Sequence, residues 1–457
     1  MSESVSVRRV TRTTLAIAVG IFLGVESVAG TLVPIYVVLA CAALLFIIVS
    51  VDSIERLTMY IYLAYMCGII LFTRSFAYIA LPKPPFYVTE SSLLSLTVLL
   101  LLSRRFVMPK RVGLWIFLLF LILGLGLILN APQFGLLPVL RDSAEIYYIW
   151  FIPVSYSVFR IMGQYVTRRH LEVGLRVFGI LVPITYILTG AIQIPAASES
   201  IAGMLLVFQM AWKWEKKRNI VDFVTTGLLL VAIVLPGARG PWIGIVLAFI
   251  ALAAVSGGQT HYVGRRIGTL TAFVLLSCGM LMLTDPAFFA KVSENFLSVF
   301  KLAGSYVQVA NNRWRLIIWG SAWGQFVQAP FNIRVGQPWL PVRLIELGYG
   351  GWNASKGYAL NTVALSNSYL QVLQWYGIWP IVPFLAIGGM ALRRSLAGVG
   401  RDPISLVLIG CMSIWFVVIG VEVVLEGPYM SAVMWSMLGF AFFYRAFVLE
   451  GGSHGAQ

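Results

Sequence analysis

The chain has 457 residues, of which 59% are hydrophobic and 11% charged, with a formal net charge of +15. Soluble globular domains carry about 25% charged residues, so this composition excludes a soluble protein and predicts an integral membrane protein. The basic residues lie in short loops between apolar runs, which is typical of topology determinants and of contacts with anionic headgroups, so we expect membrane lipids and no nucleic acid as partners.

Apolar runs of about 17–25 residues, long enough to cross a bilayer as helices, are the main predicted elements. We expect them, in chain order, at 13–31, 33–51, 57–73, 88–103, 113–130, 145–165, 172–192, 199–213, 219–236, 241–256, 267–284, 365–392, 404–424 and 430–447. The predicted fold is therefore an all-α polytopic membrane protein with about 12–14 transmembrane helices. No internal repeat or low-complexity tract is present, which favours one membrane domain made of helices in 1–284, a large loop at 285–364 and helices in 365–457.

Loop charges predict the orientation of these helices. Nearly all Lys and Arg residues of the short loops fall on one side, and the opposite short loops carry only Arg74, Lys83, Arg141 and Arg239. Basic loops stay in the cytoplasm, so we predict a bacterial inner-membrane protein with both termini cytoplasmic. The loop 285–364 is then periplasmic, since long loops cross the membrane regardless of charge.

The periplasmic loop 285–364 is expected to contain helical structure, because compact proteins rarely hold a loop of this length without any. Five positions in it recur with the spacing of an amphipathic helix that ends at Ala329–Pro330: Arg315, Trp319, Ala322, Trp323 and Phe326. We expect this helix to lie at the membrane interface, with its tryptophans at headgroup level.

Arginines on the predicted outer side are the first candidate site residues. Arg141 precedes Asp142 and Glu145 at the mouth of a predicted span, and Arg239 lies in the tight turn PGARGPW. The guanidinium fork binds phosphate through two parallel hydrogen bonds, so these residues suit a diphosphate headgroup. Alternatively, Arg141 pairs with Asp142 or Glu145, and Arg239 only anchors its turn to lipid phosphates.

Two further groups of polar residues lie in or after the long loop. Arg313 and Arg315 open the apolar segment that ends at Pro330, where they either face a headgroup or snorkel beside tryptophans. The run 365–392 begins with four polar residues, Ser366, Asn367, Ser368 and Tyr369. These side chains either bind substrate or cap the start of the helix.

The pattern R-L-I-I-W-x-x-A-W-x-x-F-x-x-x-P (Arg315 to Pro330), followed by S-N-S-Y-L-x-x-L-x-x-x-G (Ser366 to Gly377), resembles the O-antigen ligase and polymerase superfamily of envelope polysaccharide enzymes. The A-R-G turn at 238–240 is similar to the arginine turn that precedes the large loop in that family. The resemblance covers about residues 200–390.

This resemblance implies a GT-C-like membrane fold and an inverting, metal-independent glycosyltransferase without a cofactor. Such an enzyme, here a polysaccharide polymerase, passes an oligosaccharide from undecaprenyl diphosphate to an acceptor glycan hydroxyl, with other polysaccharide assembly proteins as possible partners. It further implies that Arg239 and Arg315, or Arg313, bind the diphosphate and stabilise its charge as it leaves.

One residue departs from the family pattern. The ligases carry a His-Asn pair where this chain has Ser366-Asn367, and its histidines, at 170, 261 and 454, all fall on the predicted cytoplasmic side. Either a carboxylate (Glu346, Asp142 or Glu145) is therefore the general base, or the leaving diphosphate needs little base assistance. The missing histidine favours a polymerase over a ligase that acts on a lipid core. A lipid-linked sugar flippase or other transporter, and a non-enzymatic scaffold of an export complex, are the alternatives.

Overall fold

A computed structural model describes residues 53–79, 87–166, 168–189, 197–212, 220–234, 239–255, 268, 306–337, 367–399, 403–421, 424–425 and 427–451. Within these ranges the chain is helical and forms no β-strand, which confirms the predicted all-α class there. The predicted spans 13–31 and 33–51, nearly all of 267–284, and the loop 285–364 except for 306–337 lie outside the described residues.

The described helices follow the predicted runs closely. Those before the long loop are α3 (Ile54–Ala77), α4 (Val88–Leu102), α5 (Gly113–Phe134), α6 (Leu136–Asp142), α7 (Ala144–Tyr147), η1 (Tyr148–Trp150), α8 (Phe151–Met162), α9 (Arg168–Thr189), α10 (Ala197–Trp212), α11 (Ile220–Val234) and α12 (Arg239–Val255). The later ones are α15 (Tyr306–Gln328), α18 (Ser368–Tyr376), α19 (Ile381–Leu396), α20 (Pro403–Ile419) and α21 (Pro428–Gly451).

One predicted continuous span is wrong: the run 365–392 is divided into α18 and α19 by residues 377–380. The run 145–165 stays helical from 144 to 162, with the 3-10 turn η1 between α7 and α8. Hydropathy detects apolar length but not a break within it, so the interruption at 377–380 escaped the sequence prediction.

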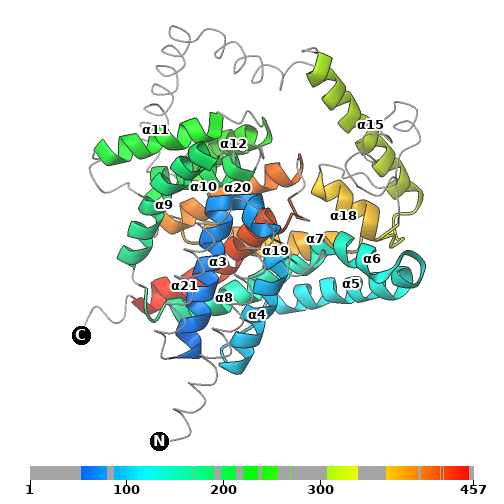
Figure 1. Ribbon diagram of the computed structural model, residues 1–457, viewed down its shortest axis with the longest axis horizontal. Coiled ribbons are helices and arrows are strands. Elements are labelled where there is room, and N and C mark those ends of the chain that lie inside the picture. The colour runs from blue at the N-terminus through cyan, green and yellow to red at the C-terminus, as the bar shows by residue number, and fades with distance from the viewer. Residues whose placement is uncertain are drawn as a thin grey trace, which may run out of the picture.

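The central helices in Figure 1 are α3, α4, α8, α19, α20 and α21. Helices α9 to α12 cover one side of this group, and α5, α6 and α18 lie on the other, with α15 along the upper edge of the view (Figure 1). The packing between α3, α8 and α21 includes polar contacts, in which Tyr62 donates to Ser155 Oγ (3.2 Å) and Ser155 to Ser436 Oγ (3.0 Å). Hydrogen bonds of this kind between apolar helices are common in membrane bundles.

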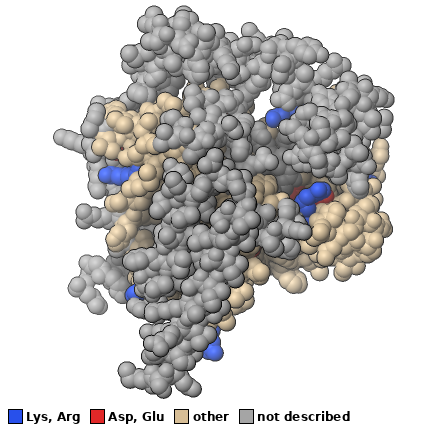
Figure 2. Space-filling model, viewed as in Figure 1, with Lys and Arg blue, Asp and Glu red and all other residues tan. Residues whose placement is uncertain are grey.

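Large apolar side chains are exposed on several of the described helices. Two helices, Ile54–Thr73 and Gly113–Phe134, are long and apolar enough to cross a membrane by length and composition, and several shorter apolar helices accompany them. Only 28% of the most apolar 18 residues of α5 are buried. Its exposed residues form a stripe at helical spacing: Leu114, Phe117, Leu121, Leu125 and Ile128. On the face seen in Figure 2 the described surface is mostly uncharged, and large exposed apolar surfaces of this kind mark contact with a protein or a membrane.

Contacts between helix ends join segments that the loop charges assign to the same side. On the predicted cytoplasmic side, Arg105 Nε lies 2.7 Å from Glu55 Oε1. On the predicted outer side, the ring centroids of Tyr78 and Tyr429 lie 6.2 Å apart.

Helix α15 is the helix that the sequence predicted in the long loop. It ends at Gln328, as expected, but it begins at Tyr306 rather than at the arginine pair. Ile318 and Ala322 are buried, whereas Trp323 is about half exposed (51%). The exposed indole agrees with a helix that keeps one face outside the protein.

Residues 329–337 fill the break between α18 and α19. Gly377 has φ +64° and ψ −149°, a backbone conformation that is essentially restricted to glycine. A Cβ there would overlap the carbonyl oxygen of Pro330. The same oxygen accepts a hydrogen bond from Ile378 N at 2.9 Å. The loop segment thus provides a backbone partner that the interrupted helix lacks.

Candidate functional site

Two of the predicted site segments meet at Val421, just beyond the end of α20. Arg315 Nη1 donates a hydrogen bond to the Val421 carbonyl at 3.2 Å. Gly240, the second residue of α12, lies against the side chain of the same valine, so that a Cβ on this glycine would overlap Val421 Cγ2. Arg239 is the neighbouring first residue of α12, and its side chain lies outside the described residues. The structure therefore brings the backbone that carries Arg239 to the residue that Arg315 contacts.

The start of α12 also contributes charge of the right sign for an anion. The first backbone N–H groups of a helix have no acceptor within it, and the helix dipole places partial positive charge at this end. Because α12 begins at Arg239 and Gly240 lies against Val421, these groups and the Arg315 guanidinium both lie near Val421. Such an arrangement suits a phosphate or diphosphate group.

Arg141 and Asp142 form an ion pair at the end of α6. Arg141 Nε lies 2.7 Å from Asp142 Oδ1, which is the pairing that the sequence left open as an alternative. About half of the Arg141 side chain is exposed (52%), whereas Asp142 is buried and its second oxygen, Oδ2, has no hydrogen-bond partner among the described residues. Burial raises the pKa of the Asp142 carboxyl above its ordinary value, and Arg141 acts in the opposite direction. A carboxylate of raised pKa with one oxygen that has no hydrogen-bond partner is suited to accept a proton.

Glu145 is fully buried in α7, three residues after Asp142. Helix α18 is joined to this segment through Tyr376. The hydroxyl of Tyr376 donates to Ser143 Oγ, in the turn between α6 and α7, at 2.7 Å. Ser143, which lies between the two outer-side acids predicted from sequence, is therefore joined directly to α18.

Glu90 is a carboxylate that the sequence analysis did not select. It lies in the first turn of α4, where it accepts hydrogen bonds from Tyr87 N (3.0 Å), from Tyr147 Oη (3.2 Å) and from Tyr148 Oη. Its signal in the sequence is an acidic residue at the mouth of an apolar run, which is costly unless it is paired or functional. The observed bonds give Glu90 a role in joining α4 to the segment that follows Glu145.

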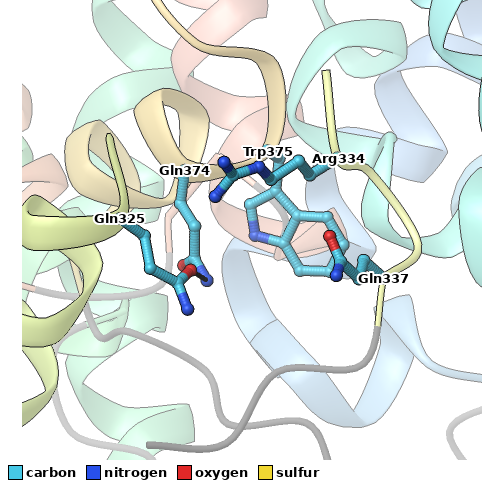
Figure 3. Close-up of a pocket in the computed structure, with 5 residues that line it drawn as sticks. All are labelled: Gln325, Arg334, Gln337, Gln374 and Trp375. Atoms are coloured by element: carbon cyan, nitrogen blue, oxygen red, sulfur yellow. Dashed lines mark hydrogen bonds between the residues drawn. The ribbon is translucent and has the colours of Figure 1, made fainter. Parts of the chain in front are cut away.

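A polar pocket lies between α15, α18 and the segment 329–337 (Figure 3). Its volume is about 50 Å³, and it is lined by Gln325 of α15, Gln374 and Trp375 of α18, and Arg334 and Gln337 of the segment. Gln374 Nε2 lies 3.4 Å from Gln325 Oε1, whereas Gln374 Oε1 is buried without a hydrogen-bond partner in the described part of the chain. Figure 3 shows the amide groups of these two glutamines side by side and the Arg334 guanidinium directed toward Gln374.

The segment 329–337 contacts three helices, α18, α5 and α6. Arg334 N donates to the Trp375 carbonyl at 2.6 Å, and Asn130 Nδ2 of α5 donates to the Ile333 carbonyl at 3.3 Å. Gly336 has φ +82° and lies against Val139 of α6 so closely that a Cβ would overlap it. The pocket and the Arg141–Asp142 pair are thus built on segments that touch each other.

The residues at the start of α18 make contacts within the protein. Asn367 is the N-cap, and its Oδ1 accepts from Leu370 N at 3.1 Å, as expected for a cap. Ser368 Oγ accepts from Val424 N at 2.9 Å. Tyr369 Oη donates to the Phe416 carbonyl of α20 at 3.0 Å. These bonds attach the start of α18 to the chain around Val421, so this motif positions the site.

Four predicted site positions lie wholly or partly beyond what the structure describes. They are Glu346, Ser366 and the side chains of Arg239 and Arg313. The pocket residues Arg334, Gln325 and Gln374 were not predicted, because glutamines far apart in sequence give no local pattern. The sequence offered one weak signal for this pocket, which is that Arg334 lies four residues after Pro330, the proline that follows the predicted helix. Comparisons of the chain with models of known protein families and with curated proteins gave no match.

Proposed function

We propose that this chain is a polytopic inner-membrane glycosyltransferase of GT-C-like fold, which acts as a polysaccharide polymerase. It transfers an oligosaccharide from undecaprenyl diphosphate to a hydroxyl of an acceptor glycan at the periplasmic face. The observation that carries the proposal is the convergence of Arg315 and the Arg239–Gly240 backbone on Val421. Two cationic segments from distant parts of the sequence meet there, as recognition of a diphosphate requires.

The membrane part of the proposal is supported by the exposed surface of α5 and by the contacts between helix ends. An apolar helix with only 28% of its most apolar residues buried needs an apolar environment outside the protein. The proposed topology can be tested with single cysteines in a cysteine-free background. We expect Gln328→Cys to react with an impermeant maleimide from the periplasm and Lys110→Cys to react only after the cells are opened. The reverse labelling would overturn the assignment of sides.

The proposed reaction is a displacement at the anomeric carbon of the carrier-linked sugar. The acceptor hydroxyl forms the new C–O bond on the face opposite the leaving group, so the configuration inverts. The C–O bond to the diphosphate breaks, and its electron pair passes to the diphosphate oxygen, whose charge Arg239 and Arg315 stabilise.

The hydroxyl proton passes to a carboxylate in this proposal. Among the candidates, Asp142 is supported by its raised pKa and by Oδ2, which has no hydrogen-bond partner among the described residues. The step needs no metal in this scheme, since the guanidinium groups neutralise the developing charge.

The deciding experiment is reaction of the purified protein in detergent with an undecaprenyl diphosphate oligosaccharide. We expect a ladder of longer lipid-linked products from the wild type and none from Arg239→Ala or Arg315→Ala. Arg111→Ala is the matched control, because Arg111 is exposed in the loop before α5, on the predicted cytoplasmic side. Polymer of normal length from the Arg239→Ala protein would refute the proposal, and a single addition to an added lipid core would favour a ligase.

Transport of a lipid-linked sugar is a second candidate, because the interruption between α18 and α19 resembles the discontinuous helices of transporters. The same detergent experiment separates the two functions, since micelles have no second compartment. Product formation there excludes pure transport. Substrate binding without product, together with movement of the lipid across vesicles, would instead assign a flippase.

A further inference from the structure

We infer that the pocket between α15, α18 and residues 329–337 binds hydroxyl groups of the saccharide, separately from the diphosphate. This inference rests on the proposed function and names a part of the site that the arginine motifs do not include. Its residues are Gln325, Arg334, Gln337, Gln374 and Trp375.

The hydrogen-bonding groups of the pocket match a sugar better than a phosphate. Gln374 is 8% exposed, and its Oε1 is an acceptor without a donor among the described residues. A buried acceptor is costly until a donor reaches it. Sugar hydroxyls donate hydrogen bonds, whereas the oxygens of an ionised phosphate only accept them and would be repelled by this carbonyl oxygen. Amide and guanidinium N–H groups nearby can donate to the same hydroxyls.

The shape of the pocket supports the same conclusion. A volume of about 50 Å³ has room for a few water-sized groups, which corresponds to substituents of a sugar rather than to a whole chain. A hydroxyl that displaces water from such a site keeps affinity where it reproduces the hydrogen bonds of that water. The indole of Trp375 contributes an apolar wall, which suits the C–H face of a sugar ring.

The pocket is also too far from Arg315 for one diphosphate to reach both. Gln325 and Arg315 lie on the same helix, ten residues apart, which corresponds to roughly 15 Å along its axis. A saccharide attached to a diphosphate at Arg315 can extend along α15 toward the pocket, and so can the end of an acceptor glycan. Both sources offer the same hydroxyl chemistry.

The test uses three probes with the purified full-length protein in detergent. The probes are undecaprenyl diphosphate, the same lipid carrying the repeat unit that accumulates in a deletion strain, and the free repeat released from it by mild acid. We expect Gln374→Leu to weaken binding of the free repeat by roughly tenfold, through loss of hydrogen bonds to its hydroxyls. Binding of the sugar-free lipid should stay unchanged, whereas Arg315→Ala should weaken it.

Two further variants protect the test against a folding defect. Gln337 is exposed at the edge of the pocket, so Gln337→Leu should fold normally and should also weaken binding of the free repeat. Gln328→Leu, at the exposed end of α15 and outside the pocket, is the matched control and should bind all probes as the wild type does. The KM values of the two pocket variants, Gln337→Leu and Gln374→Leu, then identify the ligand. A rise in KM for the lipid-linked donor alone assigns the pocket to the donor, and a rise in KM for the acceptor alone assigns it to the acceptor.

Unchanged binding of the free repeat to both the Gln374→Leu and Gln337→Leu proteins would overturn the inference. That result leaves the proposed function intact if Arg239→Ala still abolishes polymer. Conversely, loss of repeat binding in the pocket variants, with normal polymer in the Arg239→Ala strain, would retain the sugar site and remove the proposed catalysis.

Discussion

Tyr376 of α18 donates a hydrogen bond to Ser143, which lies in the turn directly after the Arg141–Asp142 pair. The two residues are 233 positions apart in sequence, yet both are buried and their oxygens lie 2.7 Å apart. This bond connects the helix that lines the pocket to the turn that positions the proposed base.

Tyr376→Phe should destabilise the protein by about 1 kcal/mol, the usual net contribution of one hydrogen bond. The same change at the exposed Tyr165 should have no measurable effect on stability. Thermal unfolding of both proteins in detergent would check this difference. Equal melting temperatures for the two variants would show that the buried bond contributes nothing.

Gly377→Ala should be far more damaging than the same change elsewhere in the C-terminal region. The positive φ alone costs about 1–3 kcal/mol for a residue with a side chain, and the new methyl group would also collide with the Pro330 carbonyl. A Cβ added at Gly389 of α19 would meet no atom within 4 Å, so Gly389→Ala is the control. The yield of monodisperse protein and its activity would be measured, and similar behaviour of the two variants would contradict the structure at residue 377.

Gly240→Ala should lower turnover by pushing the start of α12, and with it Arg239, away from Val421. A displacement of about 1 Å in a catalytic group can cost on the order of 100-fold in rate. Removing the obstructing methyl groups with Val421→Ala in the same protein should restore much of the activity, because the overlap involves Val421 Cγ2. A double variant as inactive as Gly240→Ala alone would show that this contact does not control the site.

Arg141→Gln should shift the acidic limb of the pH–rate profile to higher pH. The pKa of Asp142 is raised by burial and lowered by Arg141, so loss of the guanidinium leaves the raising effect unopposed. The base must be ionised to accept a proton, and its ionisation would then require a higher pH. The profile is measured at saturating substrate, with Arg111→Gln as the control.

Asp142→Asn tests the same assignment without relying on pH. The amide keeps the size of the side chain but cannot accept the proton as a base, so turnover should fall by roughly 100-fold or more while donor binding is retained. Normal turnover of this variant would move the role to another carboxylate or remove the need for a base.

The sequence predicted those features that depend on local pattern. Apolar runs gave the helices to within a few residues, and the spacing after Arg315 gave the end of α15 at Gln328. The polar residues before α18 predicted a helix cap as one alternative, and Asn367 forms it. These features depend on hydropathy, helical period and capping, which neighbouring residues determine.

Features that depend on tertiary packing were not predictable in the same way. Gln325 and Gln374 face each other only because α15 and α18 pack together, and neither residue belongs to a pattern of charged groups. The break at Gly377 depends on a carbonyl from Pro330, which lies in another segment. The convergence on Val421 likewise required the structure, since the sequence suggested the arginines but not the residue at which their segments meet.

The way in which residues 329–337 complete the broken helix has a consequence for engineering specificity. This stretch belongs to the framework on which α18 and α19 depend, so it cannot be exchanged together with the outer region it adjoins. Chimeras that import another protein's outer region should retain the native chain through Gln337 and should cross over only beyond it. A junction placed between α15 and Pro330 would replace the segment whose carbonyl accepts from Ile378 N, and should yield little folded protein.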